Sequence, residues 1–203
     1  MSTLLNRRAF LGTTGAFVGG TLMASPLATH ALSKGEKIKA VLVGTGVRGT
    51  SFWGKTLVED FPEILEFVGL CDINPGRLEY ARGYMGVACP TYTDFELMVK
   101  ETKPDLVIVT TKDSTHHEFI IKGLDMGCDV LTEKPLTTDE DKCQAILDAE
   151  RRSGNKLIVG FNYRWSPYPT RIKELLQSGA IGKVTSVDFH WYLNTYHGAS
   201  YFR

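Results

Sequence analysis

From Lys37 onward, short apolar runs rich in β-branched residues alternate with segments whose apolar positions recur at helical spacing. The runs predict strands at 37–43, 65–71, 105–111, 129–132 and 156–161. The segments between and after them predict helices at 47–59, 75–85, 94–102, 115–126 and 138–153. Strands that alternate with helices form βαβ units, whose strands are parallel. The pattern therefore predicts an α/β fold, a doubly wound parallel sheet of the Rossmann type, over residues 35–161.

The helix at 138–153 has the clearest end signals. Thr138 is the candidate N-cap, acidic residues fill the first turn, and Arg151 and Arg152 lie in the last turn. Gly154 follows the last turn. Many helices end at a residue in the left-handed conformation, and glycine adopts that conformation most easily. These features predict where the helix begins and ends.

The pattern changes after Phe161. An aromatic, proline-containing link leads to a predicted helix at 169–178, and an alternating run at 184–193 predicts a strand. A single strand needs a sheet, and the sequence after it supplies none. We therefore expect residues 162–203 to be a linker and the beginning of a second, α+β domain that is cut short at Arg203.

The first 31 residues differ in composition from the rest. Arg7 and Arg8 precede an uncharged stretch rich in Gly, Ala, Thr and Leu, and no acidic residue comes before Glu36. Residues 6–11, Asn-Arg-Arg-Ala-Phe-Leu, resemble a twin-arginine export signal, and the small residue Ala31 suits cleavage. We expect a signal peptide at 1–31 and a periplasmic or otherwise exported protein. A membrane anchor is the alternative, although the many Gly and Thr residues lower the hydrophobicity.

Composition narrows the class of partner. The 203 residues carry 23 basic and 23 acidic side chains, so no charge excess indicates nucleic acid, and a membrane is expected only through the export signal. The four cysteines lie far apart, without the spacing of metal ligands. We expect buried thiols and no metal site.

A glycine-rich turn follows the first predicted strand. Gly44, Gly46 and Gly49 form a GxGxxG pattern, with Val47 and Arg48 inside it. This pattern between a strand and a helix is typical of dinucleotide binding, because the backbone approaches the pyrophosphate at the helix N-terminus. All five residues are therefore candidates for cofactor binding.

Asp72 ends the second strand, twenty-three residues after Gly49. A carboxylate at this position binds the adenine ribose. NAD is favoured over NADP because a 2′-phosphate would meet a like charge, whereas Arg77 nearby leaves NADP open.

Two further strands end in candidate site residues. Thr110 and Thr111 end the third predicted strand, and Glu133 and Lys134 follow the fourth. Ligands of open α/β sheets bind at these carboxyl ends. The Lys134 ammonium is the catalytic candidate, since it can hold a substrate hydroxyl and stabilise negative charge on its oxygen. A solvated lysine beside a proline is the alternative reading.

In order and spacing these segments resemble the Gfo/Idh/MocA oxidoreductases over residues 37–193. The matching segments are GTGVRG, CDINPGR, TTKDSTHHEFIIKGLDMGCDVLTEKPLTT, VGFNYRWSP and LLQSGAIGKVTSVDFHW. The resemblance implies that Glu133 and Lys134 contact the nicotinamide and substrate, and that His116 is the family's histidine near the cofactor. It also implies that Asn162 and Arg164 approach the sugar, and that full-length relatives form homo-oligomers.

One expected feature is missing from the sequence. Relatives of this type place an acid and a histidine, four residues apart, on a helix of the second domain, and no such pair follows Arg164. His190 reads as a strand-face residue, and His197 in a predicted loop is a candidate substrate contact. The general acid or base is therefore absent from these residues.

The expected function is NAD(P)-dependent oxidation of a secondary hydroxyl of a sugar, sugar acid or cyclitol. Export adds a condition, because free NAD is scarce outside the cytoplasm and the cofactor would travel with the folded protein. One alternative is a glycoside hydrolase or lyase of the same superfamily that recycles its NAD. Another is a catalytically incomplete nucleotide-binding fragment.

Overall fold

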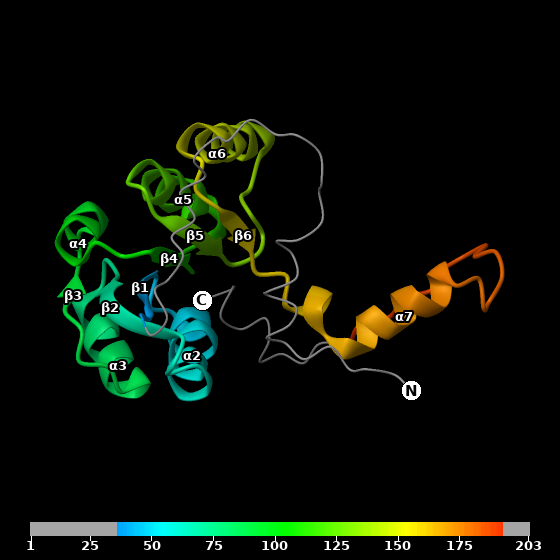
Figure 1. The fold of residues 1–203 in the computed structure, drawn as a ribbon, viewed down its shortest axis with the longest axis horizontal. Helices are drawn as coiled ribbons and strands as arrows, with labels where there is room; N and C mark the ends of the chain where they lie inside the picture. The colour runs from blue at the N-terminus through cyan, green and yellow to red at the C-terminus, as the bar shows by residue number, and fades with distance from the viewer. Residues whose placement is uncertain (1–35, 193–203) are drawn as a thin grey trace. The chain divides into compact units, whose positions relative to one another are not determined.

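The computed structural model of the protein describes residues 36–192, and its centre is one six-stranded sheet (Figure 1). The strands are β1 (Ile38–Val43), β2 (Leu65–Cys71), β3 (Thr91–Tyr92), β4 (Leu106–Val109), β5 (Asp129–Thr132) and β6 (Leu157–Val159). Their order is β3-β2-β1-β4-β5-β6, and every neighbouring pair is parallel. This is the expected doubly wound Rossmann sheet, with one strand more than predicted, because the two-residue β3 is too short to leave a pattern.

Helices and short turns connect the strands. They are η1 (Arg48–Lys55), α2 (Thr56–Asp60), α3 (Pro75–Met85), α4 (Phe95–Thr102), η2 (Asp113–Thr115), α5 (His116–Asp125), α6 (Glu140–Ser153), η3 (Asn162–Trp165) and α7 (Pro167–Gln177). The expected helix at 47–59 is present, but η1 is wound as a π-helix before α2 continues it.

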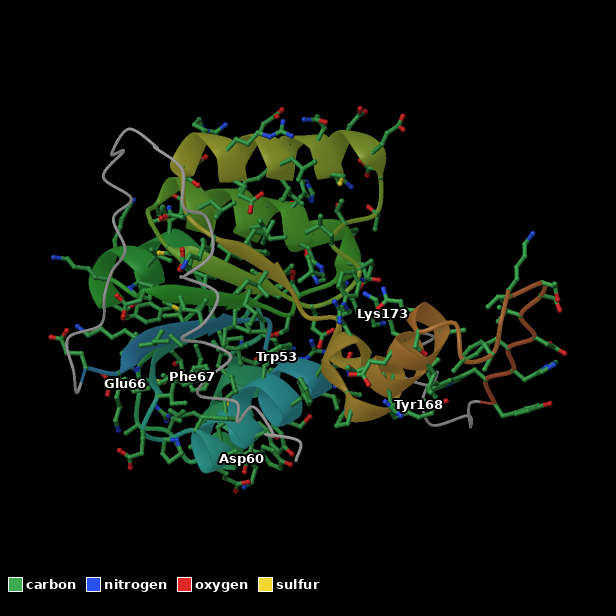
Figure 2. The ribbon with its side chains drawn as sticks, turned by 45° about the vertical axis from the view of Figure 1, so that its right-hand side comes forward. Trp53, Asp60, Glu66, Phe67, Tyr168 and Lys173 are labelled. Carbon is green, nitrogen blue, oxygen red and sulfur yellow. The ribbon has the colours of Figure 1, made fainter. Side chains whose placement is uncertain are left out.

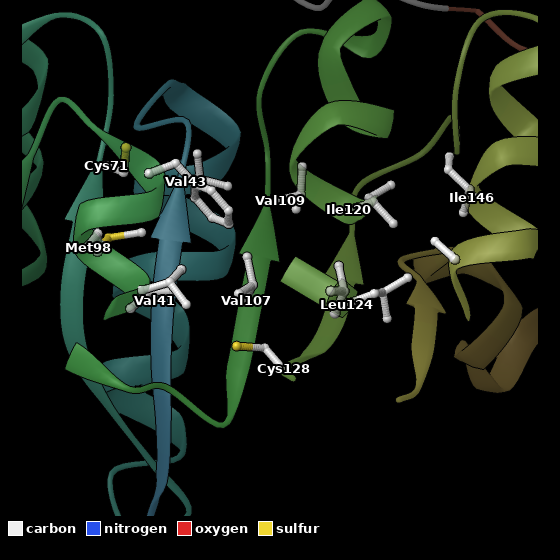
Figure 3. Packing of buried hydrophobic residues seen from close by; sticks show 14 residues of the cluster. Val41, Val43, Cys71, Met98, Val107, Val109, Ile120, Leu124, Cys128 and Ile146 are labelled. Carbon is white, nitrogen blue, oxygen red and sulfur yellow. The ribbon is translucent and has the colours of Figure 1, made fainter. Parts of the chain in front are cut away.

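Alternation along the strands gives the sheet two apolar faces. Val41 and Val43 of β1 point to one side, whereas Ala40 and Leu42 point to the other. The first side packs on α4, α5 and α6, and its cluster includes Met98, Ile120 and Ile146, which Figure 3 labels. The second side packs on η1, α2 and α3. The buried sheet lies between two helical layers, which explains why its strands read as continuous apolar runs.

Two expectations are corrected by the structure. The N-cap of α6 is Asp139, whose carboxylate accepts the backbone N–H of Lys142 at 3.0 Å, rather than Thr138. Both residue types cap helices, and only the backbone conformation distinguishes them. The strand expected at 184–193 is not formed at 184–192, where the backbone is irregular and every residue is exposed. No other segment between 36 and 192 pairs with it, and an unpaired strand has no stabilising ladder.

Other expectations fall on undescribed residues. The signal peptide at 1–31 lies outside residues 36–192, as does His197. Within the described range, no helix is long and apolar enough to cross a bilayer. Helix α7 has no buried residue, and Tyr168 and Lys173, labelled in Figure 2, lie exposed on it.

Candidate dinucleotide site

The carboxyl ends of three neighbouring strands bring the predicted residues to one edge of the sheet. Val43 of β1 is level with Val109 of β4, and Val109 is level with Thr132 of β5. The chain leaves β1 toward β2 on one side, whereas β4 lies on the other side. Ligands of doubly wound sheets bind at such a change of direction. The turn at Gly44, the threonine pair and Glu133 therefore meet where a dinucleotide is expected.

The three glycines of the turn have different reasons to lack a side chain. Gly44 has a φ of +90°, and a Cβ there would lie 2.7 Å from the backbone of Thr110. A Cβ on Gly49 would clash with the Gly44 carbonyl oxygen. Gly46 has nothing within 4 Å of its Cβ position, so its backbone is open to a ligand. The turn therefore fits a pyrophosphate at Gly46, and the other two glycines allow the turn itself to close.

Asp72 is buried beside this turn. Its Oδ2 accepts the backbone N–H of Thr45 at 2.7 Å and the Thr45 hydroxyl at 3.0 Å, and its Oδ1 accepts the backbone N–H of Asn74 at 2.9 Å. The carboxylate therefore orients the glycine-rich turn as well as standing at the predicted ribose position. Arg77 is exposed in the first turn of α3.

The hydroxyl groups of the two threonines make different hydrogen bonds. The Thr110 hydroxyl is buried and donates to the Gly44 carbonyl oxygen at 2.6 Å, so it closes the turn from the side of β4. The half-buried Thr111 hydroxyl accepts from the Thr115 hydroxyl at 3.0 Å. Thr111 is thus the member of the pair nearer to the surface.

His116 lies beneath the edge. Its side chain is 1% exposed, with Nδ1 2.9 Å from the Pro135 carbonyl oxygen and Nε2 3.1 Å from the Thr111 carbonyl oxygen. The sequence predicted a contact with the cofactor or substrate region, but both ring nitrogens meet backbone carbonyls of the protein. The described geometry gives His116 a supporting role, joining the two loops that follow β4 and β5.

Glu133 accepts three hydrogen bonds at the edge, as Asp72 does. It is 6% exposed, and its Oε1 accepts from Arg48 Nε at 2.5 Å and from Trp53 Nε1 at 2.7 Å. Its Oε2 accepts the backbone N–H of Lys134 at 3.1 Å. Trp53, which lies where η1 faces the sheet (Figure 2), was not among the predicted site residues. A tryptophan in an amphipathic helix reads as core, so no sequence signal identifies it.

The remaining predicted residues are exposed. Val47 is 80% exposed at the turn, and Lys134 is exposed at the end of β5. Asn162 and Arg164 are exposed in η3, which follows β6 at the same edge. Among residues 36–192, no cluster of three or more His, Cys, Asp or Glu side chains has the arrangement of a metal site.

Known proteins share this fold and these segments. The model of the oxidoreductase family with an NAD-binding Rossmann fold, Gfo/Idh/MocA, matches residues 38–161. The chain belongs to this family. The match begins at β1, includes the glycine-rich turn and continues through the last strand, β6. NAD is therefore the dinucleotide for which the site is built, as the carboxylate of Asp72 predicts.

Curated relatives include the putative oxidoreductase YteT of Bacillus subtilis, 41% identical over 167 residues, which are 80% of this chain and 39% of that protein. An inositol 2-dehydrogenase/D-chiro-inositol 3-dehydrogenase of Lactiplantibacillus plantarum is 27% identical over 161 residues, 77% of this chain and 46% of that protein. The chain therefore spans less than half the length of these relatives.

Solved structures agree with the fold. The myo-inositol 2-dehydrogenase of Lactobacillus plantarum superposes with a TM-score of 0.67 at 25% identity, over 73% of this chain and 43% of that chain. The WlbA dehydrogenase of Chromobacterium violaceum, in complex with NADH and UDP-GlcNAcA, superposes with a TM-score of 0.66 at 27% identity, over 72% of this chain and 41% of that chain.

Proposed function

We propose that the whole protein is an NAD-dependent dehydrogenase that oxidises a secondary hydroxyl of a cyclitol, sugar or sugar acid. The observation that carries the proposal is the convergence of the open Gly46 backbone with the exposed Lys134 at one sheet edge. The inositol dehydrogenases among the relatives support a polyol substrate.

The residues have distinct roles in this proposal. Gly46 and the following helix N-terminus bind the pyrophosphate, and Asp72 binds the adenine ribose. NAD, when bound, supplies the carbon that accepts a hydride. The Lys134 ammonium donates a hydrogen bond to the substrate hydroxyl and stabilises the negative charge that develops on its oxygen. Asn162 and Arg164, with His197, are assigned to the substrate side, and a second domain is assigned the acid–base pair and homo-oligomer contacts.

A lysine variant tests this assignment. Lys134→Met keeps the length of the side chain and removes its charge, so we expect turnover of inositols or sugars to fall about a hundredfold or more. NADH formation measures turnover, and equilibrium dialysis measures NAD affinity, which should stay within about twofold of the wild type because the pyrophosphate turn is intact. The control, Lys100→Met, removes an exposed lysine of α4. Wild-type turnover by Lys134→Met would contradict the proposal.

We assign the protein to an exported location, on the strength of Arg7 and Arg8 before an uncharged stretch. Cell fractionation tests the assignment, with lysine replacing both arginines as the comparison. Export predicts that the wild-type chain leaves the cytoplasm and that the double variant stays there. An identical distribution of the two proteins would overturn it.

Export favours a second candidate, in which NAD is recycled and the overall reaction is hydrolysis or elimination of a glycoside. Product formed from glycosides without added NAD and without net NADH supports recycling, whereas a stoichiometric need for added NAD excludes it. A nucleotide-binding fragment without catalysis predicts a third result, which is thermal stabilisation by NAD without any turnover.

A further inference from the structure

One buried carboxylate oxygen joins two segments that are far apart in the sequence. Arg48 and Glu133 are separated by 85 positions, and Glu133 and Trp53 by 80. Both donors reach the same Oε1 of Glu133, at 2.5 Å from Arg48 and 2.7 Å from Trp53. Charge-assisted hydrogen bonds are the stronger kind, and removing a partner from a buried carboxylate is costly.

The donors belong to different parts of the candidate site. Arg48 lies inside the glycine-rich turn and begins η1, Trp53 lies further along η1, and Lys134 carries the backbone N–H that bonds the second oxygen of Glu133. The carboxylate therefore connects the segment that binds the pyrophosphate with the segment that carries the catalytic candidate. A shift of one segment relative to the other would break at least one of these bonds.

Packing holds the two donors in place. The Arg48 guanidinium carbon lies 3.9 Å from the centre of the Phe52 ring, an arrangement that favours a cation over an aromatic face. The Trp53 indole lies against Gly160, where an added Cβ would come within 2.8 Å of Cζ2. Neither donor is therefore a freely moving surface side chain, although the Arg48 side chain remains 42% exposed.

We propose that Glu133 is a positioning residue that acts through the Arg48 side chain and Trp53, and that this tie keeps the glycine-rich turn in register with the end of β5. The tie pre-organises the turn, so it increases NAD affinity by lowering the ordering cost of binding. The proposal depends on NAD binding by this domain and is independent of the substrate assigned above.

NAD affinity of the whole 203-residue chain gives the first test, by equilibrium dialysis of variants. Glu133→Gln removes the charge at nearly constant volume, and Arg48→Met removes the guanidinium. We expect each to weaken NAD binding by about tenfold, the usual effect of losing one charge-assisted bond. The double variant should bind NAD no more weakly than the weaker-binding single variant, because both substitutions remove the same interaction.

The control breaks an ion pair of the same type elsewhere. Arg152→Met removes a guanidinium that bonds Asp125 at 2.6 and 2.8 Å on the helical layer of α5 and α6. Its NAD affinity should equal that of the wild type. The proposal is overturned if Glu133→Gln binds NAD as tightly as the wild type or more tightly, because the bond between Glu133 and Arg48 would then contribute nothing to NAD affinity.

Hydrogen exchange of the same chain without NAD gives a readout that does not require cofactor binding. Glu133→Gln and Trp53→Phe, which removes the indole donor together with part of the ring, should speed amide exchange at residues 45–50 several-fold and leave α5 protected. Equal acceleration over the whole sheet would show a purely structural role and overturn the proposal. If the wild type itself bound no NAD, the proposed dehydrogenase would fail, whereas exchange at the turn would still decide whether the tie exists.

Discussion

Thr45 donates two hydrogen bonds to a single oxygen of Asp72, from its backbone N–H at 2.7 Å and from its hydroxyl at 3.0 Å. The second oxygen of Asp72 accepts the backbone N–H of Asn74. The residue that the sequence indicates for ribose recognition therefore also orients the turn that receives the pyrophosphate. A substitution at Asp72 therefore affects both ribose recognition and the orientation of the turn, and an informative variant has to change one more than the other.

Asp72→Asn removes the charge and keeps one acceptor oxygen. That oxygen can still accept both hydrogen bonds from Thr45, whereas the bond from the Asn74 N–H is lost because the amide NH2 only donates. The turn keeps its bonds through Thr45, and the like charge facing a 2′-phosphate is gone. We expect the ratio of NADP to NAD affinity to rise by about tenfold, equivalent to about 1.4 kcal/mol. Equilibrium dialysis with both dinucleotides measures the ratio, and an unchanged ratio would show that Asp72 does not govern the preference.

Two glycines of the turn should respond differently to alanine. Gly46→Ala places its Cβ in open space, so the protein should fold normally and lose NAD affinity, because the methyl group occupies the approach to the backbone. Gly49→Ala places its Cβ against the Gly44 carbonyl oxygen and Thr110 Oγ1, which should lower the free energy of unfolding by about 1–3 kcal/mol. Urea unfolding and NAD dialysis on both variants check this, and a stable Gly49→Ala would contradict the packing.

His116 supports the site from below, and its loss should be a stability effect. His116→Ala removes a buried ring whose nitrogens lie 2.9 Å from the Pro135 carbonyl oxygen and 3.1 Å from the Thr111 carbonyl oxygen, and it leaves a cavity. The lost hydrogen bond and the cavity should together lower the free energy of unfolding by about 1–3 kcal/mol, so the urea midpoint should fall clearly. His117→Ala on the same helix is the comparison, since its Nδ1 makes no hydrogen bond in the structure. A larger loss for His117→Ala would refute the supporting role.

Three cysteines should be unreactive in the native protein. Burial raises the pKa of Cys71 to about 12, with the Asp72 charge adding to the effect, and burial raises the pKa values of Cys89 and Cys128 to about 11. The thiolate is the reactive form, so at mildly alkaline pH a thiol reagent should label the half-buried Cys143 first. Mass spectrometry of labelled peptides, with urea-unfolded protein as the comparison, measures this. Rapid native labelling of Cys71 would contradict it.

The same shifts give a pH dependence with a definite sign. A thiol whose pKa is higher in the folded state keeps its proton there while the unfolded chain releases it. The stabilisation is complete below the ordinary thiol pKa of 9.0, and it is lost as the pH rises through 9 toward 11–12. The free energy of unfolding should fall over this interval, less so when Cys71 is replaced by alanine.

Much of the fold follows from local pattern. The expected strand at 65–71 and helix at 75–85 coincide with β2 and α3, because continuous apolar runs and the Asn74 cap are encoded by neighbouring residues. The strand expected at 184–193 is not formed over residues 184–192, because it depends on partners far away in the sequence. Alternation predicts a strand there, but a strand is stabilised by its neighbour, and the described chain offers none.

The sequence by itself determined five of the six strands and the main helices in their order along the chain, the glycine-rich turn and the carboxyl-end positions of Asp72 and Lys134. It did so because side-chain periodicity, turn residues and a parallel sheet's common edge are properties of short segments. Only the tertiary structure decided that Arg48 and Trp53 bond Glu133 and that His116 faces inward. Those contacts join residues up to 85 positions apart, and the register of β1, β4 and β5 that brings them together is set by packing of the whole sheet.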